Sequence, residues 1–230
     1  CRRVGTARRG GVIALLAALA GGYLLGAIPT AALVARARGK DVFALGSGNM
    51  GAMNTARNLN VWLGVLVLAL DVAKGAAATS FGMLVAGLTT TAALDPAGAT
   101  IPLALNAPLA AGFGAVLGHA WSAFVRFKGG KALATTLGVS LPLYPQAGLA
   151  ALVLIVAAYL ITRRSGIAAV ITMLAYPVLT LLALDKAGWV REDVFAVVTW
   201  VLPIVAVVLI KHLIARLRPT GAACTPPGPG

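Results

Sequence analysis

Two short polar segments carry most of the side chains that could do chemistry in this chain of 230 residues. The first runs from Gly46 through Asn54 to Arg57, and the second runs from Lys128 to Lys131. Glycines allow several backbone N–H groups to converge on an anion, and lysine or arginine supplies the positive charge that a phosphate needs. The two segments therefore predict a phosphate-binding site.

The first segment offers neutral hydrogen-bond donors and one arginine, whose planar guanidinium can bind two phosphoryl oxygens at once. Its glycines would let backbone N–H groups approach the same anion. The residues concerned are Ser47, Gly48, Asn49, Gly51, Asn54 and Arg57. The alternative is a glycine- and asparagine-rich turn before a helix, in which Asn54 is the N-cap.

The second segment places Gly129 and Gly130 between Lys128 and Lys131, and Thr135 follows four residues after the second lysine. This spacing predicts an anion-binding nest with converging charge, and it puts Thr135 on the same helical face as Lys131. The segment is not a Walker A loop, because the upstream glycine and the following Ser/Thr are missing. The alternative is a group of lysines that snorkel to the membrane surface.

Three titratable residues lie in or at the end of apolar stretches, where a charge is costly and indicates a functional or bracing role. Asp71 and Lys74 are three residues apart, so they share a helical face and can neutralise each other. They would either brace the phosphate site or place one of their groups on the substrate. His119 could be a general base or a residue that merely caps a helix end.

The elements that position these residues are membrane helices, because the chain is 60% hydrophobic, has a mean hydropathy of +0.92 and contains only 11% charged residues. Its apolar runs are continuous instead of alternating, which favours an all-α integral membrane protein over a β-barrel. At about 20 residues per crossing, the length predicts a polytopic bundle of about seven transmembrane helices. We expect them at 11–35, 61–87, 102–118, 132–146, 147–162, 167–184 and 194–215.

These helices would form one domain over residues 11–218, after a basic tail at 1–10 and before a Pro/Gly-rich tail at 219–230 that is disordered by composition. The first apolar run continues into a full span, so we expect a retained helix rather than a cleaved signal peptide. The span at 132–146 is short and ends among prolines, so it can be tilted or cross only partly.

The charge distribution predicts the orientation. The net charge of +13 comes largely from short loops, which is typical of orientation signals and lipid-headgroup contacts rather than of nucleic-acid binding. With seven spans, most of the basic residues fall on one side, which the positive-inside rule makes cytoplasmic together with the C-terminus. The arginines within residues 2–9 oppose this orientation, whereas the internal loops agree with one another. Both polar segments would then lie on the cytoplasmic face.

The chain resembles the PlsY family of bacterial membrane-bound acyl-phosphate:glycerol-3-phosphate acyltransferases. The first family motif reads roughly GSGNxGATNxxR, and residues 46–57 match it except that Met53 replaces the threonine. The second reads roughly GHxFPxFLxFKGGKGVAT, and residues 118–135 match it with Ser122 in place of proline and Ala132 in place of glycine. Further matches are at residues 22–29, 71–75 and 162–165.

The third family motif, roughly HRxNIxRLxxG, is degraded. Lys211 and Arg216 occupy its basic positions, whereas Ile210 and Leu213 replace its histidine and asparagine. His212 lies two residues from the histidine position. We therefore expect reduced activity rather than a changed fold.

The resemblance implies transfer of a fatty acyl group from acyl phosphate to the 1-hydroxyl of glycerol 3-phosphate, with lysophosphatidic acid and inorganic phosphate as products. It implies catalytic roles for Ser47, Asn49, Arg57, His119, Lys128 and Lys131. Phosphate binding would be the role of Gly48, Gly51, Asn54, Gly129, Gly130, Thr135, Ser165, Lys211 and Arg216. Asp71 and Lys74 would brace the site.

Acyl phosphate is already activated, so no serine or cysteine nucleophile is needed, and the general base would be His119 or a substrate phosphate oxygen. We expect no cofactor, and no metal because the multi-aspartate motif of alcohol phosphatidyltransferases is missing. The partners would be the two substrates and membrane lipids, with no nucleic acid, at the inner membrane of a bacterium. The alternatives are a phosphate or anion transporter and a catalytically impaired paralogue that binds lipid phosphate.

Overall fold

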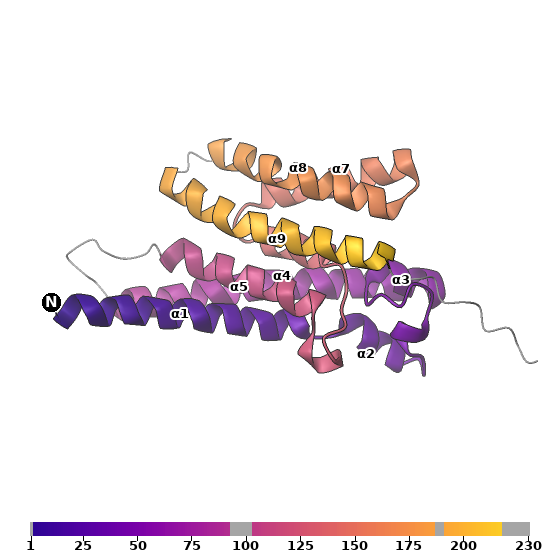
Figure 1. Cartoon of the computed structure of the whole chain (residues 1–230), viewed down its shortest axis with the longest axis horizontal. Coiled ribbons are helices and arrows are strands. Elements are labelled where there is room, and N and C mark those ends of the chain that lie inside the picture. Colours follow the sequence, from indigo (N-terminus) through magenta and orange to yellow (C-terminus); the bar gives the residue numbers. More distant parts are fainter. Residues whose placement is uncertain (1, 93–102, 187–190, 218–230) are drawn as a thin grey trace, which may run out of the picture.

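Helices make up all the regular structure in the computed structural model, which describes residues 2–92, 103–186 and 191–217. The long helices are α1 (Arg2–Ala27), α4 (Val61–Ala92), α5 (Leu103–Ala120), α7 (Pro145–Thr162), α8 (Ser165–Lys186) and α9 (Arg191–Leu217). Between them lie α2 (Thr30–Arg36), α3 (Ala52–Asn58), α6 (Leu133–Ser140) and the 3-10 turns η1 (Val42–Ala44) and η2 (Ala123–Val125). The long helices run roughly along one axis (Figure 1). The expected tail at 219–230 lies outside the described residues.

Six helical stretches of the described chain are long and apolar enough to cross a membrane, which confirms the polytopic all-α bundle with six such helices instead of about seven. The difference lies at 132–146, where α6 has only eight residues. At 1.5 Å per residue this is about 12 Å, less than half of an apolar core of about 30 Å. Proline ends the short helix, and Pro145 begins the next one. Because α1 begins at Arg2, the residues expected to form a basic tail continue that helix.

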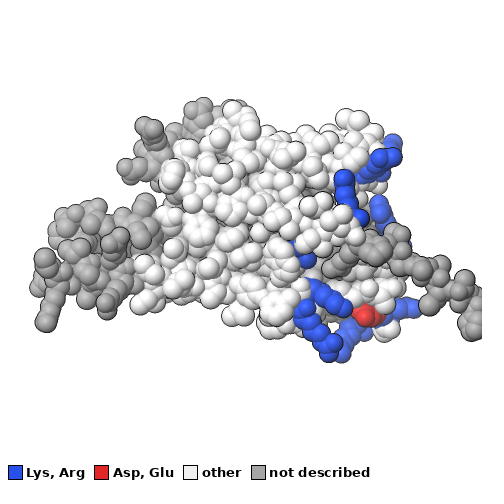
Figure 2. All heavy atoms as spheres, in the orientation of Figure 1, with Lys and Arg blue, Asp and Glu red and all other residues white. Residues whose placement is uncertain are grey.

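The chain nevertheless returns to the same end of the bundle after this partial crossing. In Figure 1, α2, α3, the connection from α7 to α8 and the C-terminal end of α9 lie at one end, and the N-terminal end of α1 lies at the other. The lysines and arginines coloured in Figure 2 gather at the first of these ends. The internal loop charges therefore share one side, as the sequence predicts. We call this side the basic end.

Helices α1 and α5 pack backbone to backbone because glycines face one another where they cross. A Cβ on Gly22 or Gly26 would overlap backbone atoms of α5, and a Cβ on Gly114 or Gly118 would overlap backbone atoms of α1. Small residues four apart give membrane helices this close approach. The crossing fixes the ends of α1 and α5 relative to each other, and with them the segments that follow.

A second glycine pair anchors α6 to α4. A Cβ on Gly75 would overlap the carbonyl oxygen of Thr135, and a Cβ on Gly138 would overlap the carbonyl oxygen of Val72. The hydroxyl of Thr79 also donates to the carbonyl oxygen of Val139, 3.3 Å away. The helix that follows the second polar segment is thus attached to the helix that carries Asp71 and Lys74.

Candidate active site

Asn54 organises the first polar segment from inside. Its side-chain oxygen accepts hydrogen bonds from the Ser47 N–H at 3.1 Å, the Ser47 hydroxyl at 3.2 Å and the Asn58 amide at 3.0 Å. Its own amide nitrogen donates to two backbone carbonyl oxygens of the same loop. Gly46 and Gly48 turn the loop with φ angles of +49° and +61°, where glycine is favoured. Because Asn54 is buried and its polar atoms are bound within the segment, it shapes the loop.

The second polar segment begins with a turn that is attached to the end of α1. The Ser122 carbonyl oxygen accepts a hydrogen bond from the Phe127 N–H at 2.8 Å, and the Ser122 N–H donates to the Lys128 carbonyl oxygen at 3.2 Å. The Ser122 hydroxyl donates to the carbonyl oxygen of Ala27 at 2.5 Å. The serine that stands where the family motif has proline therefore joins the segment to α1.

The paired glycines are required because this segment lies against other backbone. A Cβ on Gly129 would overlap the carbonyl oxygens of His119 and Ala120. A Cβ on Gly130 would overlap Nε2 of His119 and lie 2.5 Å from the carbonyl oxygen of Met50, in the first segment. The Gly130 N–H also donates to the His119 carbonyl oxygen at 3.0 Å. The two polar segments therefore contact each other.

Lys128 contacts the 3-10 turn η1, which directly precedes the first segment. Its Nζ lies 5.3 Å from the centre of the Phe43 ring, within the range of a cation–π interaction. The lysine itself is exposed. Residues predicted from two distant parts of the sequence to serve one phosphate site are thus brought side by side.

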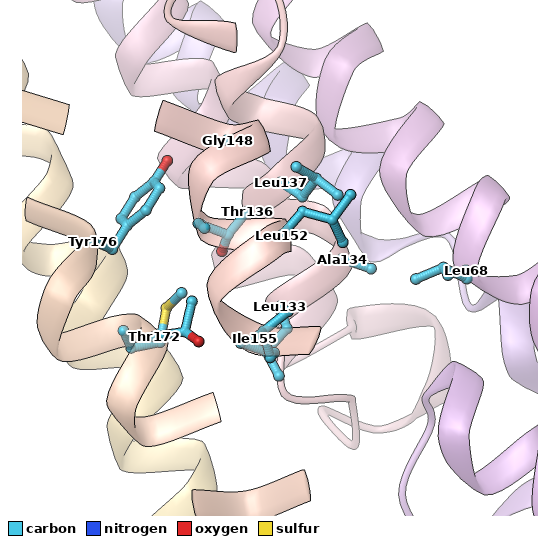
Figure 3. A pocket seen from close by; sticks show the side chains of 12 residues that line it. Leu68, Leu133, Ala134, Thr136, Leu137, Gly148, Leu152, Ile155, Thr172 and Tyr176 are labelled. Carbon is cyan, nitrogen blue, oxygen red and sulfur yellow. The ribbon is translucent and has the colours of Figure 1, made fainter. Parts of the chain in front are cut away.

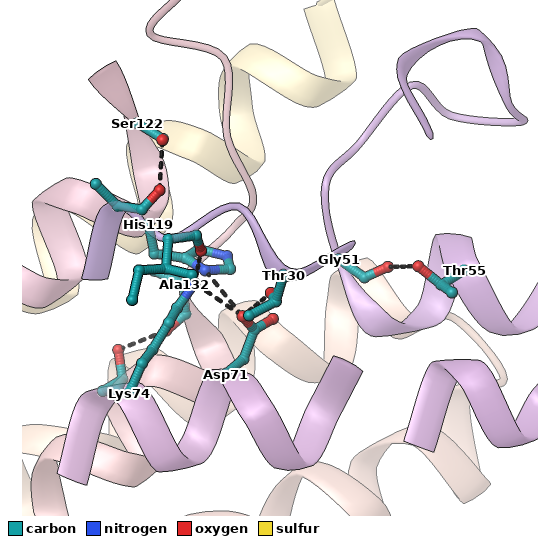
Figure 4. A network of polar contacts seen from close by, with 11 residues as sticks. Thr30, Gly51, Thr55, Asp71, Lys74, His119, Ser122 and Ala132 are labelled. Atoms are coloured by element: carbon teal, nitrogen blue, oxygen red, sulfur yellow. Dashed lines mark hydrogen bonds and ion pairs between the residues drawn. The ribbon is translucent and has the colours of Figure 1, made fainter. Parts of the chain in front are cut away.

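Beneath the segments, Asp71 collects three polar neighbours (Figure 4). Its Oδ1 accepts a hydrogen bond from the Thr30 hydroxyl at 2.6 Å, pairs with Lys74 Nζ at 2.8 Å and lies 3.5 Å from Nδ1 of His119. Lys74 also donates to the carbonyl oxygen of Ile28 at 3.0 Å. This buried ion pair and its neighbours join α4 to the α1–α2 junction and to α5. Within the described chain, no group of three or more His, Cys, Asp or Glu residues could hold a metal ion.

His119 lies under the second segment rather than on its surface. It is 3% exposed, with Nδ1 toward Asp71 and Nε2 against Gly130. Among the described residues, Nδ1 has no partner at hydrogen-bond geometry. The imidazole ring therefore packs against the paired glycines from the interior of the bundle.

A second group of positive charges forms where this segment meets α8 and α9. Burial and the positive charge of Arg216 lower the pKa of half-buried Lys131 below the ordinary 10.5. A Cβ on Gly166, beside Ser165 in the first turn of α8, would lie 3.8 Å from the Arg216 guanidinium. His212, one turn before Arg216 on α9, is buried and bound through Nδ1 to a carbonyl oxygen of its own helix. Neither Lys131 nor Arg216 pairs with an acidic residue in the described part, so the arrangement favours an anion between them.

The start of α6 adds backbone donors to this group. Its N-cap residue, Ala132, has a left-handed φ of +59° and provides no side-chain cap, so the first N–H groups of the helix can bind an anion. Thr135 is fully buried, and its hydroxyl has no hydrogen-bond partner among the residues described. Because α6 begins at Leu133, Lys131 precedes the helix, and the helical face that we expected it to share with Thr135 is not formed.

Lys211 connects α9 to the end of α5. Its Nζ donates to a backbone carbonyl oxygen at the end of α5 at 2.7 Å and lies 5.1 Å from the centre of the Trp121 ring. Ile210 and Leu213, which replace the motif's histidine and asparagine, are 48% and 57% exposed on another face of α9. The histidine that this helix turns into the bundle is His212.

Two other residues predicted to belong to the site lie near the surface. Arg57 is exposed in the last turn of α3 and Asn49 is half-buried, and neither side chain has a hydrogen bond or ion pair among the described contacts.

Thr30 was missed by sequence analysis; it binds Asp71 and directly follows Pro29 at the break between α1 and α2. A hydroxyl at a helix break, available to an intramembrane aspartate such as Asp71, is the signal that could have identified it.

An apolar cavity of about 110 Å³ lies inside the bundle and is lined in part by the first residues of α6 (Figure 3). It is lined by residues of α4, α6, α7 and α8, and its first lining residue on α6 is Leu133. Leu68 and Leu152 are the exposed lining side chains, so the cavity opens between α4 and α7 toward the surroundings of the bundle. Such a space suits a hydrocarbon chain.

Known proteins match the chain over most of its length. The family model described as glycerol-3-phosphate acyltransferase matches residues 16–219. A glycerol-3-phosphate acyltransferase of Myxococcus xanthus (strain DK1622) is 38% identical over 183 residues, which are 78% of this chain and 87% of the relative. One from Geotalea daltonii is 36% identical over 204 residues, 86% of this chain and 91% of the relative.

Two solved structures are also similar. One is PlsY (YgiH), an integral membrane glycerol 3-phosphate acyltransferase, in its glycerol 3-phosphate form, with a TM-score of 0.66 and 28% identity over 87% of this chain and 88% of that one. The other is its lysophosphatidic acid form, with a TM-score of 0.65 and 29% identity over 88% of this chain and 91% of that one.

Proposed function

The chain belongs to the glycerol-3-phosphate acyltransferase family, and we propose on this basis that it transfers a fatty acyl group from acyl phosphate to the 1-hydroxyl of glycerol 3-phosphate. The observation that carries the proposal is the contact of the two polar segments at Met50 and Gly130, which gathers the anion-binding groups of both. The bound forms of PlsY, with glycerol 3-phosphate and with lysophosphatidic acid, support the same reaction.

The reaction requires two phosphates to be held near one carbonyl carbon, so positive charge must be present on both sides of it. We assign the phosphate of acyl phosphate to Lys131, Arg216 and the first N–H groups of α6, because Leu133, the first residue of α6, lines the apolar cavity and Lys131 precedes it by two residues. We assign glycerol 3-phosphate to the side of the first segment, where Lys128, Arg57 and Asn49 have accessible polar groups.

The chemical step needs no nucleophile from the protein. The 1-hydroxyl oxygen attacks the acyl carbonyl carbon, the bond from that carbon to the bridging phosphate oxygen breaks, and inorganic phosphate leaves. The hydroxyl proton needs an acceptor, and His119 is enclosed between Asp71 and Gly130. We therefore assign the general base to an oxygen of the departing phosphate, which leaves as hydrogen phosphate.

Three residues that the family motifs mark as functional receive positioning roles in this proposal. Asn54 shapes the first segment, His119 supports Gly130, and Lys211 holds α9 against α5. Each is buried and packed against the backbone of the site, so its loss would move the groups that touch the substrates.

We further propose that the protein lies in the inner membrane of a bacterium, with the site on the cytoplasmic side. The basic end of the bundle carries the site (Figure 2), and cytoplasmic loops of membrane proteins are enriched in lysine and arginine. Glycerol 3-phosphate, a polar substrate, would reach the site from the aqueous side, and the acyl chain would enter the cavity from the lipid.

Reconstituted protein tests the proposal directly. Vesicles that contain it receive acyl phosphate and labelled glycerol 3-phosphate, and lysophosphatidic acid and inorganic phosphate should form in equal amounts. Arg38→Gln, at an exposed residue of the same end, is the control for general loss of charge, and Lys131→Gln is the variant expected to fail. Uptake of phosphate without product would indicate a transporter, and binding of glycerol 3-phosphate without turnover would indicate an impaired paralogue.

A further inference from the structure

The apolar cavity ends at the side chain of Tyr176, whose hydroxyl group the proposed reaction does not use. Ser140 Oγ and Tyr176 OH are 2.5 Å apart and share a hydrogen bond. Tyr144, whose side chain is buried, follows Ser140 by four residues and lies outside the lining of the cavity. In Figure 3, Gly148 and the hydroxyl of Tyr176 lie at one end of the cavity, and Leu133, which follows the basic segment, lies toward the other.

The end of the cavity at Tyr176 is closed because α6 ends inside the bundle. The chain turns back after Ser140, and the N–H groups of Leu143 and Tyr144 donate to the Ser140 carbonyl oxygen at 3.2 and 2.8 Å. Gly148 of α7 is close enough that a Cβ there would lie 2.8 Å from the Ser140 Cβ. Tyr176 is 1% exposed. In sequence order it is the last residue of α8 that lines the cavity. An acyl chain that extends from Leu133 along the cavity therefore meets packed side chains at Tyr176.

We propose that Tyr176, held in place by Ser140, sets the length of the acyl chain that the enzyme prefers. This inference rests on the proposed acyl transfer. The terminal methyl group of a chain of the preferred length would pack against the Tyr176 ring. A longer chain would have to displace the Ser140–Tyr176 hydrogen bond or bend out between Leu68 and Leu152. Both alternatives are unfavourable, because the first leaves buried hydroxyls unpaired and the second removes apolar packing.

The test is the profile of kcat/KM across a series of saturated acyl phosphates of increasing length. Tyr176→Ala and the milder Tyr176→Leu should move the optimum to longer chains, and Ala151→Leu, which fills the cavity, should move it to shorter ones. The ratio of kcat/KM for a chain longer than the optimum to that for the optimal chain should rise roughly tenfold in Tyr176→Ala, since one misfitting methylene in an apolar pocket changes kcat/KM roughly 10- to 200-fold. Tyr159→Ala, at a tyrosine of α7 outside the cavity lining, is the matched control and should keep the wild-type optimum.

A uniform loss of rate at every length, with the optimum unchanged in Tyr176→Leu and Ala151→Leu, would overturn the chain-length role and leave Tyr176 as a structural residue. If the wild-type protein transferred no acyl group of any length, the proposed function itself would fail. The two failures are therefore distinguishable in one experiment.

Discussion

Replacing Gly130 by alanine should impair catalysis because the new methyl group has no space. Its Cβ would overlap Nε2 of His119 and lie 2.5 Å from the Met50 carbonyl oxygen, whereas real Cβ contacts stay above 3.0 Å. The second segment would have to move away from the first by at least about 0.5 Å. Such overpacking costs about 1–3 kcal/mol, and if it acts on the positioned phosphate groups it corresponds to a decrease of roughly 5- to 150-fold in kcat/KM.

The measurement is kcat/KM for glycerol 3-phosphate in reconstituted vesicles, together with thermal unfolding in detergent to show that the variant is folded. Gly87→Ala is the matched control, because a Cβ there has nothing within 4 Å and the glycine lies in the helix α4. Alanine in a helix is as good as glycine or better, so kcat/KM should be unchanged.

A double-mutant cycle with His119→Ala tests the cause of the loss. This substitution removes one of the two obstacles, so Gly130→Ala should cost less in the His119→Ala background than in the wild type. An equal cost in both backgrounds, or full activity of Gly130→Ala alone, would refute the argument that the glycine is required by close approach to the histidine ring.

Three further predictions follow from charge and burial. Lys131→Gln should lower kcat/KM roughly tenfold to a hundredfold through the loss of a charge-assisted phosphate contact, whereas Arg126→Gln, at an exposed residue, should change it little; equal losses would contradict the site assignment. Since lysine is charged only below its pKa, the KM for acyl phosphate should rise at alkaline pH as Lys131 loses its proton. Arg216→Gln removes one cause of the lowered pKa, so the midpoint of that rise should move to higher pH even though KM is larger at every pH; an unmoved midpoint would contradict this coupling. Asp71→Ala leaves Lys74 buried without its carboxylate partner and should destabilise the protein by about 3–5 kcal/mol in reversible unfolding, and an unfolding free energy equal to that of the wild type would exclude the bracing role.

The helical bundle could be predicted from the sequence because lipid leaves the backbone few alternatives to the helix. Long apolar runs marked six of the crossings, and the prolines after Leu141 indicated that the remaining one is incomplete. Run length alone could not show how far this partial helix enters the bundle. That depth is set by the close contact of Gly75 and Gly138, which depends on residues far apart in the sequence.

The sequence indicated which residue types gather at the candidate site, but not the direction of each side chain. Asn54 has the donors that a phosphate needs, and only the path of the loop decides that they bind backbone carbonyl oxygens instead. For α9, the sequence is apolar around most of the helix, so periodicity could not distinguish the face of Lys211 from that of Ile210 and Leu213. Packing against α5 makes that distinction, because Lys211 reaches a carbonyl oxygen at the end of α5.

The buried ion pair would allow the proposed site for two phosphates to be both strongly positive and rigid. A chain of contacts runs from Gly130 through His119 and Asp71 to Thr30, so the glycine turn rests on the junction of α1 and α2. Because Asp71 neutralises Lys74 within this support, the frame beneath the site adds little net charge. In the proposed reaction, the positive field that acts on the substrates would then come from the lysines and arginines at the surface of the site. Charges that need no reorganisation during the reaction stabilise the transition state most effectively. Because the supporting frame has little net charge, the number of positive side chains at the site can match the charge of the two phosphates.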